Sequence, residues 1–170
     1  MTPKGSTTRW MPSWQALLVA LLVAATVSGL GSLATDTGPW YGALDKPPWQ
    51  PPDWVFGPVW TVIYLLIALS AAMAWTLAAD RARRVRIVSL FALNAVLNLM
   101  WTVLFFALRR PDWALIEIGL LWLSIVALIV VVAPASRTAA WLLAPYLAWV
   151  SFAAALNLAI VRLNAPFAGA

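Results

Sequence analysis

The sequence predicts an all-α integral membrane protein, a bundle of five transmembrane helices with a long Pro/Trp-rich loop between the first two. Of its 170 residues, 64% are hydrophobic and only 10% are charged, far from the balance of a water-soluble domain. A helix needs about 20 mostly apolar residues to cross about 30 Å of hydrocarbon. Five segments meet this requirement: 14–34, 57–79, 87–108, 113–133 and 139–161. We expect residues 1–170 to form a single transmembrane domain.

The first apolar segment has two interpretations. Lys4 and Arg9 precede it, and Ser32-Leu33-Ala34 resembles the cleavage site of a secretory signal peptide. The apolar stretch is nevertheless longer than a usual signal-peptide core. Small residues also recur at every fourth position, a spacing suited to close helix packing: Ala16, Ala20, Ala24, Ser28 and Ser32. We therefore expect a retained helix, with a cleaved signal as the alternative.

Residues 35–56 connect the first two spans and should lie outside the hydrocarbon. Prolines interrupt helical and strand patterns there and favour stiff, extended or polyproline geometry: Pro39, Pro47, Pro48, Pro51 and Pro52. The segment can serve as a lid or as an anchor whose aromatic residues rest at headgroup depth: Trp40, Tyr41, Trp49 and Trp54. Because long structureless loops in compact domains tend to be functional, we favour the lid.

The other connections are short and polar, so consecutive helices should be antiparallel. Each of the connections 80–86, 109–112 and 134–138 holds at least one arginine. Seven basic residues then share the side of the amino terminus: Lys4, Arg9, Arg81, Arg83, Arg84, Arg86 and Arg137. Four lie on the opposite side: Lys46, Arg109, Arg110 and Arg162. Because basic residues gather on the cytoplasmic side of membrane proteins, we expect a multi-pass protein with a cytoplasmic amino terminus.

The composition excludes several function classes. The chain has no cysteine and no histidine, so disulfide scaffolds, thiolate or imidazole metal sites and Cys or His nucleophiles lack their residues. We expect no metal site and no required cofactor. The formal charge of +5 does not indicate nucleic-acid binding, because the basic residues form short clusters between apolar runs, as expected beside anionic lipid headgroups. The expected partners are the lipid bilayer and a hydrophobic small molecule.

Twelve tryptophans are far more than usual, and several fall inside the predicted spans. Residues three and four apart share a helix face, and three spans each place aromatic residues on one face with small or amide side chains. These faces are Trp60, Tyr64, Ala68, Ala71 and Trp75 on the second span, Asn94, Asn98, Trp101 and Phe105 on the third, and Tyr146, Trp149, Ala153 and Asn157 on the fifth.

Such faces should converge inside the bundle. Hydrocarbon offers no hydrogen-bond partner to a carboxamide, so the three asparagines should point inward, and hydrogen bonding between helices is their simplest role. Bulky indoles on converging helices cannot all pack backbone-close and would wall a slot that suits a planar apolar ligand. Glu117, one turn inside the fourth span, is costly when ionised there. We expect it to pair with Arg109 or Arg110 near the interface, with a ligand contact or proton relay as the alternative.

With these residues in view, the chain resembles the TspO/MBR family, the tryptophan-rich sensory proteins and their relative, the translocator protein or peripheral benzodiazepine receptor. Four motifs in order carry the resemblance: Trp40-Tyr41 with Leu44-Asp45-Lys46-Pro47-Pro48-Trp49-Gln50-Pro51-Pro52, Phe56-Gly57-Pro58-Val59-Trp60-Thr61-Val62-Ile63-Tyr64, Asn94 through Trp101 with Phe105-Phe106, and Pro145-Tyr146-Leu147-Ala148-Trp149 with Phe152 and Leu156-Asn157. The resemblance covers nearly the whole chain.

The resemblance implies a five-helix bundle, often a homodimer, with a pocket capped by the first loop that binds tetrapyrroles such as protoporphyrin IX. It implies that Trp60 and Trp149 match indoles involved in light-dependent porphyrin breakdown. Pocket or lid positions of the family correspond to Trp40, Tyr41, Trp49, Asn94, Asn98, Trp101 and Tyr146. No Lys or Arg follows Tyr146 within five residues, so the short cholesterol-recognition pattern, itself weak, is absent, which favours tetrapyrroles over sterols.

Three functions remain open from the sequence. The first is binding of tetrapyrroles or similar flat hydrophobic ligands, for transport or stress sensing. The second is an enzyme that degrades porphyrin oxidatively in light, with porphyrin as substrate and Trp60 and Trp149 as catalytic residues. The third is a structural or partner-binding membrane protein whose aromatic faces simply pack. We favour the first.

Overall fold

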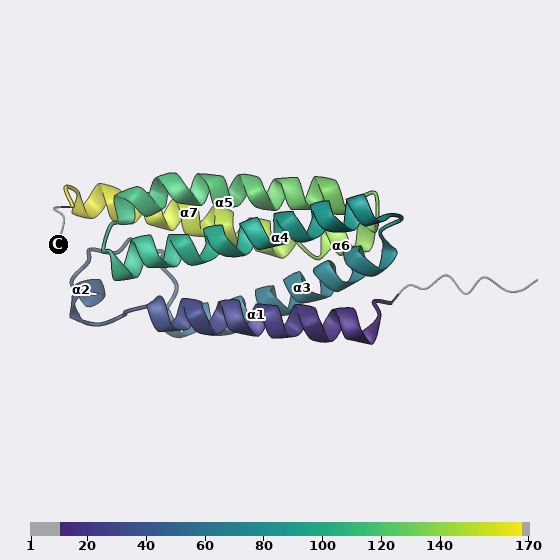
Figure 1. Ribbon diagram of the computed structural model, residues 1–170. Coiled ribbons are helices and arrows are strands. Elements are labelled where there is room, and N and C mark those ends of the chain that lie inside the picture. The colour runs from purple at the N-terminus through teal and green to yellow at the C-terminus, as the bar shows by residue number, and fades with distance from the viewer. Residues whose placement is uncertain (1–10, 168–170) are drawn as a thin grey trace, which may run out of the picture.

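The computed structural model describes residues 11–167 and shows a bundle of long helices (Figure 1). Five helices are long and apolar enough to cross a membrane, and the described part of the chain contains no strand. The long helices are α1 (Trp14–Ala34), α3 (Phe56–Leu77), α4 (Arg81–Thr102), α5 (Pro111–Val132) and α7 (Ala144–Asn164). Consecutive long helices run antiparallel, with α4 between the α1/α3 pair and the α5/α7 pair in Figure 1. This arrangement confirms the predicted all-helical membrane architecture.

The first helix has the bounds that the sequence predicts. Its N-cap is Ser13, whose side chain accepts a hydrogen bond from the Ala16 backbone N–H, as a capping serine is expected to do. The Ser13 backbone N–H donates to Thr76 Oγ1 at 3.1 Å, which fastens the start of α1 to the end of α3. Helix α1 packs chiefly against α3 and contains no fully buried residue. Most of its surface therefore faces outward.

Helix α4 begins at Arg81, six residues earlier than the predicted start at residue 87. Asp80 is its N-cap, and the Arg83 backbone N–H donates to Asp80 Oδ1 at 2.7 Å. The predicted start was wrong because the sequence pattern places the arginines in the connection before the helix. They mark only the edge of the hydrocarbon, since a capped helix can continue into the headgroup region.

The fifth predicted span, 139–161, is two helices. A short helix, α6 (Arg137–Trp141), precedes α7, and the chain bends between them at Leu142 and Leu143. Ser136 caps α6 by accepting from the Ala139 backbone N–H at 3.1 Å. Ser70 Oγ of α3 donates to the Ala139 carbonyl at 2.8 Å. Pro145, the second residue of α7, marks this interruption, because it has no N–H with which to continue the hydrogen bonds of α6. The prediction of one continuous span did not take this proline into account.

The connection between α1 and α3 is not a structureless loop. It contains α2 (Pro39–Gly42) and a 3₁₀ turn, η1 (Asp53–Val55), which leads directly into α3. The expectation that prolines prevent helix formation here was wrong at Pro39, because proline is well suited to the first position of a helix. Asn164 at the end of α7 bonds both backbone groups of Asp45, accepting from N–H and donating to C=O, each at 2.9 Å. These bonds tie the connection to the end of the bundle.

Three core clusters fill the interior of the described chain, and those at its two ends differ in their side chains. The third cluster, largely aliphatic, comprises Ile63, Leu97, Ile118, Leu121, Ile125, Tyr146 and Val150. At the α6 end, α3 packs through small residues into a core of Met73, Ala74, Ala78, Ile87, Val132, Ala139 and Ala140. At the α2 end, aromatic side chains dominate, and the core cluster there comprises Tyr41, Phe105, Ala114, Leu156 and Ile160, with Trp40, Phe56, Trp101, Phe106 and Phe152 packed against it. The aromatic half is where the candidate site lies.

Candidate ligand-binding site

A cavity of about 470 Å³ opens in the aromatic half of the bundle, a volume within the range of small-molecule sites. Its walls come from α1, the α1–α3 connection, α3, α4 with its following turn, and α7. The cavity brings together nine of the side chains that the sequence singles out: Tyr41, Trp60, Tyr64, Asn98, Trp101, Phe105, Trp149, Ala153 and Asn157. The indoles of Trp60, Trp101 and Trp149 therefore surround an interior space and do not splay outward into lipid.

Three tryptophans from three helices form the aromatic walls. On α3, the Trp60 and Tyr64 rings lie 5.5 Å apart between centroids. Trp101 of α4 lies tilted against Phe105 at 5.3 Å. On α7, Trp149 contacts Phe56 edge-on at 5.6 Å. Aromatic neighbours at such separations stabilise one another by roughly 0.5–1.5 kcal/mol each, so the walls are held in place before any ligand binds.

A chain of hydrogen bonds runs from the cavity wall into the core. Tyr64 Oη donates to Asn98 Oδ1 at 2.8 Å, and Asn98 Nδ2 donates to Tyr146 Oη at 3.2 Å. Tyr146 Oη in turn donates to Asn94 Oδ1 at 3.3 Å, and Asn94 Nδ2 donates to Ser124 Oγ at 2.8 Å. The chain joins α3, α4, α7 and α5, which is the cross-helix role expected of intramembrane amides.

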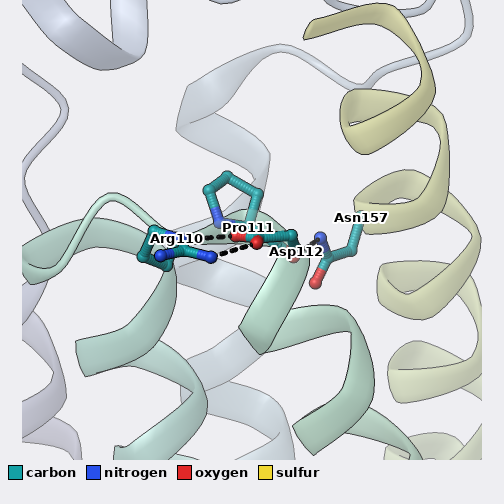
Figure 2. A network of polar contacts seen from close by, with 4 residues as sticks. All are labelled: Arg110, Pro111, Asp112 and Asn157. Carbon is teal, nitrogen blue, oxygen red and sulfur yellow. Dashed lines mark hydrogen bonds and ion pairs between the residues drawn. The ribbon is translucent and has the colours of Figure 1, made fainter. Parts of the chain in front are cut away.

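Asn157 also forms hydrogen bonds to groups of two other helices, at the α2 end of the bundle. Its Oδ1 accepts from the Trp101 indole N–H at 3.2 Å, and its Nδ2 donates to the Pro111 carbonyl at 2.9 Å. Figure 2 shows Asn157 reaching from α7 to the first residue of α5, where Arg110 pairs with Asp112. Asn157 therefore orients a cavity indole and fixes the start of a neighbouring helix.

Four predicted site residues do not line the cavity. Asn94 and Tyr146 are buried behind its wall, in the hydrogen-bond chain just described. Trp40 lies outside it, edge-on to Phe105 at 6.3 Å, and lines a separate hollow of about 380 Å³ near Arg109. Trp49 is 49% exposed and packs edge-on against Phe152 at 5.8 Å. Periodicity places Asn94 and Tyr146 on the inner faces of their helices, and the resemblance places Trp40 and Trp49 in the pocket or lid, but neither gives the depth of a side chain.

Much of the polar wall of the cavity does not follow from the sequence pattern. Hydroxyl side chains from α1 and the residues after it line the cavity, together with hydroxyls from α3 and α4: Ser28, Ser32, Thr35, Thr37, Thr61 and Thr102. Ser28 and Ser32 were interpreted only as small residues for helix packing. Their hydroxyl groups, four residues apart on an otherwise apolar helix, were the available signal.

A π-helical turn, η2 (Val103–Ala107), continues α4 beside the cavity, and such turns often occur at functional sites. The Leu108 N–H donates to the Val103 carbonyl at 2.9 Å, which widens the turn. As a result Phe105 and its neighbour Phe106, 4.8 Å apart between ring centroids, both line the cavity. The sequence pattern predicted Phe105 alone, because adjacent residues diverge in a regular α-helix.

Tyr41 and Asp53 bring the α1–α3 connection into the site. Tyr41 Oη donates to Asp53 Oδ1 at 3.2 Å and accepts from Gln50 Nε2 at 3.1 Å. Burial, and then the charge of Asp53, raises the pKa of Tyr41 to about 12. The Lys46 ammonium lies 3.8 Å from the centre of the Tyr41 ring. Asp53 had not been predicted as a site residue.

Glu117 does not have the expected basic partner. It is 4% exposed, and neither carboxyl oxygen has a hydrogen-bond partner within residues 11–167. Arg109 instead lies 3.9 Å from Asp36, and Arg110 pairs with Asp112. The predicted ion pair was wrong because acids nearer in space or sequence, at the edge of the membrane, take both arginines.

The predicted aromatic face of the second span does not lie wholly in the cavity. Trp60 and Tyr64 point into the cavity, whereas Trp75, on the same face four turns later, is 41% exposed. The Arg84 guanidinium lies over the Trp75 ring at 5.5 Å from its centre. This is the arrangement expected of an interfacial anchor, so Trp75 belongs to the opposite end of the molecule.

Comparison with known proteins gives the same family along the chain. The model of the TspO/MBR family matches residues 16–163. The tryptophan-rich protein TspO of Chlorobaculum tepidum is 39% identical over 151 residues, 88% of this chain and 94% of that protein. Protein CrtK of Rhodobacter capsulatus is 34% identical over 87% of this chain and 92% of its own length. The human translocator protein is 36% identical over 76% of this chain and 78% of its own. The chain therefore belongs to the TspO/MBR family of multi-pass membrane proteins.

Proposed function

We propose that this protein binds a tetrapyrrole such as protoporphyrin IX, or a similarly flat hydrophobic molecule, in the aromatic cavity and acts in its transport or in stress sensing. The carrying observation is the cavity of about 470 Å³ with Trp60, Trp101 and Trp149 in its walls, one from each of three helices. A planar macrocycle gains both stacking and dispersion from such walls. The names of relatives support a role in sensing or translocation: "Tryptophan-rich sensory protein" in Cereibacter sphaeroides, 31% identical, and the human translocator protein.

In this proposal the α1–α3 connection acts as a lid over the cavity. Tyr41 and Asp53 of the connection line the cavity. The Asn164 side chain holds the connection by hydrogen bonds to both the N–H and the C=O of Asp45. A ligand that enters from this end must pass the connection. Opening would break these two hydrogen bonds between the Asn164 side chain and the Asp45 backbone, and at about 0.5–1.5 kcal/mol each they are a modest barrier.

Fluorescence titration tests the proposal. Protoporphyrin IX added to protein in detergent should quench tryptophan emission with saturation at micromolar porphyrin. Trp149→Phe should weaken binding because it shortens one wall. Trp141→Phe is the matched control, since Trp141 is 76% exposed on α6, at the other end of the bundle. Absence of saturable quenching in the unmodified protein at micromolar porphyrin contradicts the proposal.

A second function, light-dependent oxidation of bound porphyrin by dioxygen, is favoured by a cluster of oxidisable rings. Trp60 lines the cavity, and its ring lies 5.5 Å from that of Tyr64 and 6.2 Å from that of Tyr146. One of these rings can donate an electron to the photoexcited macrocycle, which passes it to dioxygen to form superoxide. The ring radical then takes an electron back from the macrocycle, so the oxidised macrocycle and superoxide combine and the ring is restored. Illuminated porphyrin should then disappear faster with the unmodified protein than with the Trp60→Phe, Trp149→Phe double variant. Equal rates for the two proteins contradict this activity.

We further propose that the α6 end of the bundle faces the cytoplasm. Five arginines and one aspartate lie at that end within residues 11–167: Arg81, Arg83, Arg84, Arg86, Arg137 and Asp80. The α2 end has four basic and four acidic residues: Lys46, Arg109, Arg110, Arg162, Asp36, Asp45, Asp53 and Asp112. Because the chain has no cysteine, Arg83→Cys and Asp45→Cys are clean labelling sites. A membrane-impermeant thiol reagent should label Cys at position 45 from outside the cell, and labelling of position 83 instead contradicts this orientation.

A further inference from the structure

We propose that Asp53 makes the cavity selective for the charge of its ligand: the edge of the flat molecule that enters the cavity is uncharged or cationic, and carboxylates are kept outside. The inference rests on the proposed function, and it names the class of ligand that the same cavity prefers. For porphyrins it predicts that an esterified macrocycle binds more tightly than the free dicarboxylic acid.

The charge of the cavity lining is the first observation. Among the described residues that line the cavity, only Asp53 has a formal charge at neutral pH. The other polar groups of the lining are hydroxyls, carboxamides and indoles. A carboxylate placed inside therefore meets a like charge and no base.

The Asp53 carboxylate is also held in position. Its Oδ1 accepts from Tyr41 Oη at 3.2 Å and from Gln50 Nε2 at 3.3 Å. Asp53 begins the 3₁₀ turn that runs directly into α3, so its backbone is fixed by the helix that also carries Trp60. Among the described residues, no Lys or Arg nitrogen lies within 4.0 Å of the Asp53 carboxylate. The ion pairs found there join Arg109 with Asp36 and Arg110 with Asp112. Asp53 is exposed to solvent, its carboxylate is positioned by these two hydrogen bonds, and no ion pair neutralises its charge among the described residues.

The bases of this end lie outside the cavity. Lys46 is held against the ring of Tyr41, 3.8 Å from its centre, and is not part of the lining. Arg109 is 3.9 Å from Asp36 and lines the separate hollow beside Trp40. A ligand with carboxylates at one edge is thus expected to enter with its apolar edge first, so that its carboxylates remain in solvent near these bases.

The magnitude follows from electrostatics at a partly wet site. Two like charges held about 5 Å apart at an effective dielectric constant of 20 to 40 repel by enough to change affinity at least tenfold. Porphyrins with free propionates can avoid part of this repulsion by turning those groups outward. We therefore expect a preference of about tenfold for the ester.

The test compares protoporphyrin IX with its dimethyl ester by tryptophan quenching at neutral pH in one detergent. The unmodified protein should bind the ester about tenfold more tightly. Asp53→Asn keeps an acceptor for Tyr41 and removes the charge, so it should tighten binding of the free acid and abolish the preference for the ester. Asp53→Glu should restore the preference. Asp45→Asn is the matched control, because it removes an exposed acid of the same connection that does not line the cavity.

The outcomes separate the two proposals. If neither porphyrin binds the unmodified protein, the proposed function fails. If both bind and the free acid binds at least as tightly as the ester, the proposed function stands and the selectivity inference is overturned. The comparison of the two ligands on unmodified protein decides this even if Asp53→Asn does not fold.

Discussion

The two halves of the bundle are built from the same helices but differ in what lies between them. In the α6 half, Ala74 of α3 and Ala78, which directly follows that helix, pack in one cluster with Ile87 of α4 and Ala139 of α6, and both are 4% exposed or less. In the α2 half, the same helix presents Trp60 and Tyr64 to an open cavity. Small residues allow helix backbones to approach closely, whereas bulky rings hold them apart. The comparison teaches that side-chain size along one helix decides where a membrane bundle closes and where it stays open.

Filling the open half should give the largest effect on ligand binding. Ala153 lines the cavity on α7, and Ala153→Trp would place an indole in the space of the ligand. We expect porphyrin affinity to fall by about a hundredfold or more, since a filled site excludes the ligand, while thermal stability in detergent stays close to that of the unmodified protein. Ala148→Trp, at an exposed position of the same helix, should leave binding unchanged. Undiminished binding by Ala153→Trp would show that the ligand lies elsewhere.

Enlarging a residue in the closed half should act on stability instead. Ala74 is fully buried among small residues, so Ala74→Leu should cost about 1–3 kcal/mol in unfolding free energy through overpacking. Unfolding in mixed micelles measures this, with Ala92→Leu at an exposed position of α4 as control. If Ala74→Leu is as stable as Ala92→Leu, the closed half is not tightly packed and the contrast between the halves is lost.

The connection at the open half should loosen at high pH. Because burial and the charge of Asp53 raise the pKa of Tyr41 to about 12, the folded protein holds this proton more tightly than the unfolded chain, whose tyrosines titrate near 10. The stability from this group is therefore complete below about pH 10 and is lost as pH rises toward 12. Proteolysis of the connection should increase over that range. Tyr41→Phe removes this titration, so an identical pH profile in that variant would contradict the assignment.

The hydrogen-bond chain behind the cavity should give the smallest effect. Tyr146→Phe removes the hydroxyl that links Asn98 and Asn94. Interhelical hydrogen bonds in membranes contribute about 0.6 kcal/mol on average, with about 1.7 kcal/mol as the upper measured value, so the loss of unfolding free energy should fall in that range. Porphyrin binding should change little, because Tyr146 lies behind the wall. A loss of binding as large as that of Ala153→Trp would instead place Tyr146 in direct contact with the ligand.

Much of the fold was predictable because the membrane imposes it. Runs of about 20 apolar residues leave few alternatives to spanning helices, and the predicted bounds of α1 match the structure. The bend before α7 has a sequence signal in Pro145, the second residue of that helix, because proline lacks the N–H needed to continue a preceding helix. The π-turn at Phe105 was not predictable, because no Gly or Pro lies within Val103–Ala107.

The sequence predicts which helix faces form the walls of the site, but it does not predict which side chains reach the cavity and which lie behind its wall. A 3.6-residue period brings Trp60, Tyr64 and Trp101 to the interior, yet it places Asn94 and Tyr146 on the same faces although they lie behind the cavity. Asp53 was missed because its place depends on how the connection folds against the bundle, through bonds to Tyr41 and Gln50 that no periodicity describes.

An experimentally determined structure of the complex with protoporphyrin IX would test the central claim most directly. The account predicts a macrocycle within the cavity, in contact with Trp60, Trp101 and Trp149, and with its propionates directed away from Asp53. A macrocycle bound only to the outer, lipid-facing surface, with the cavity closed by aliphatic side chains, would contradict it.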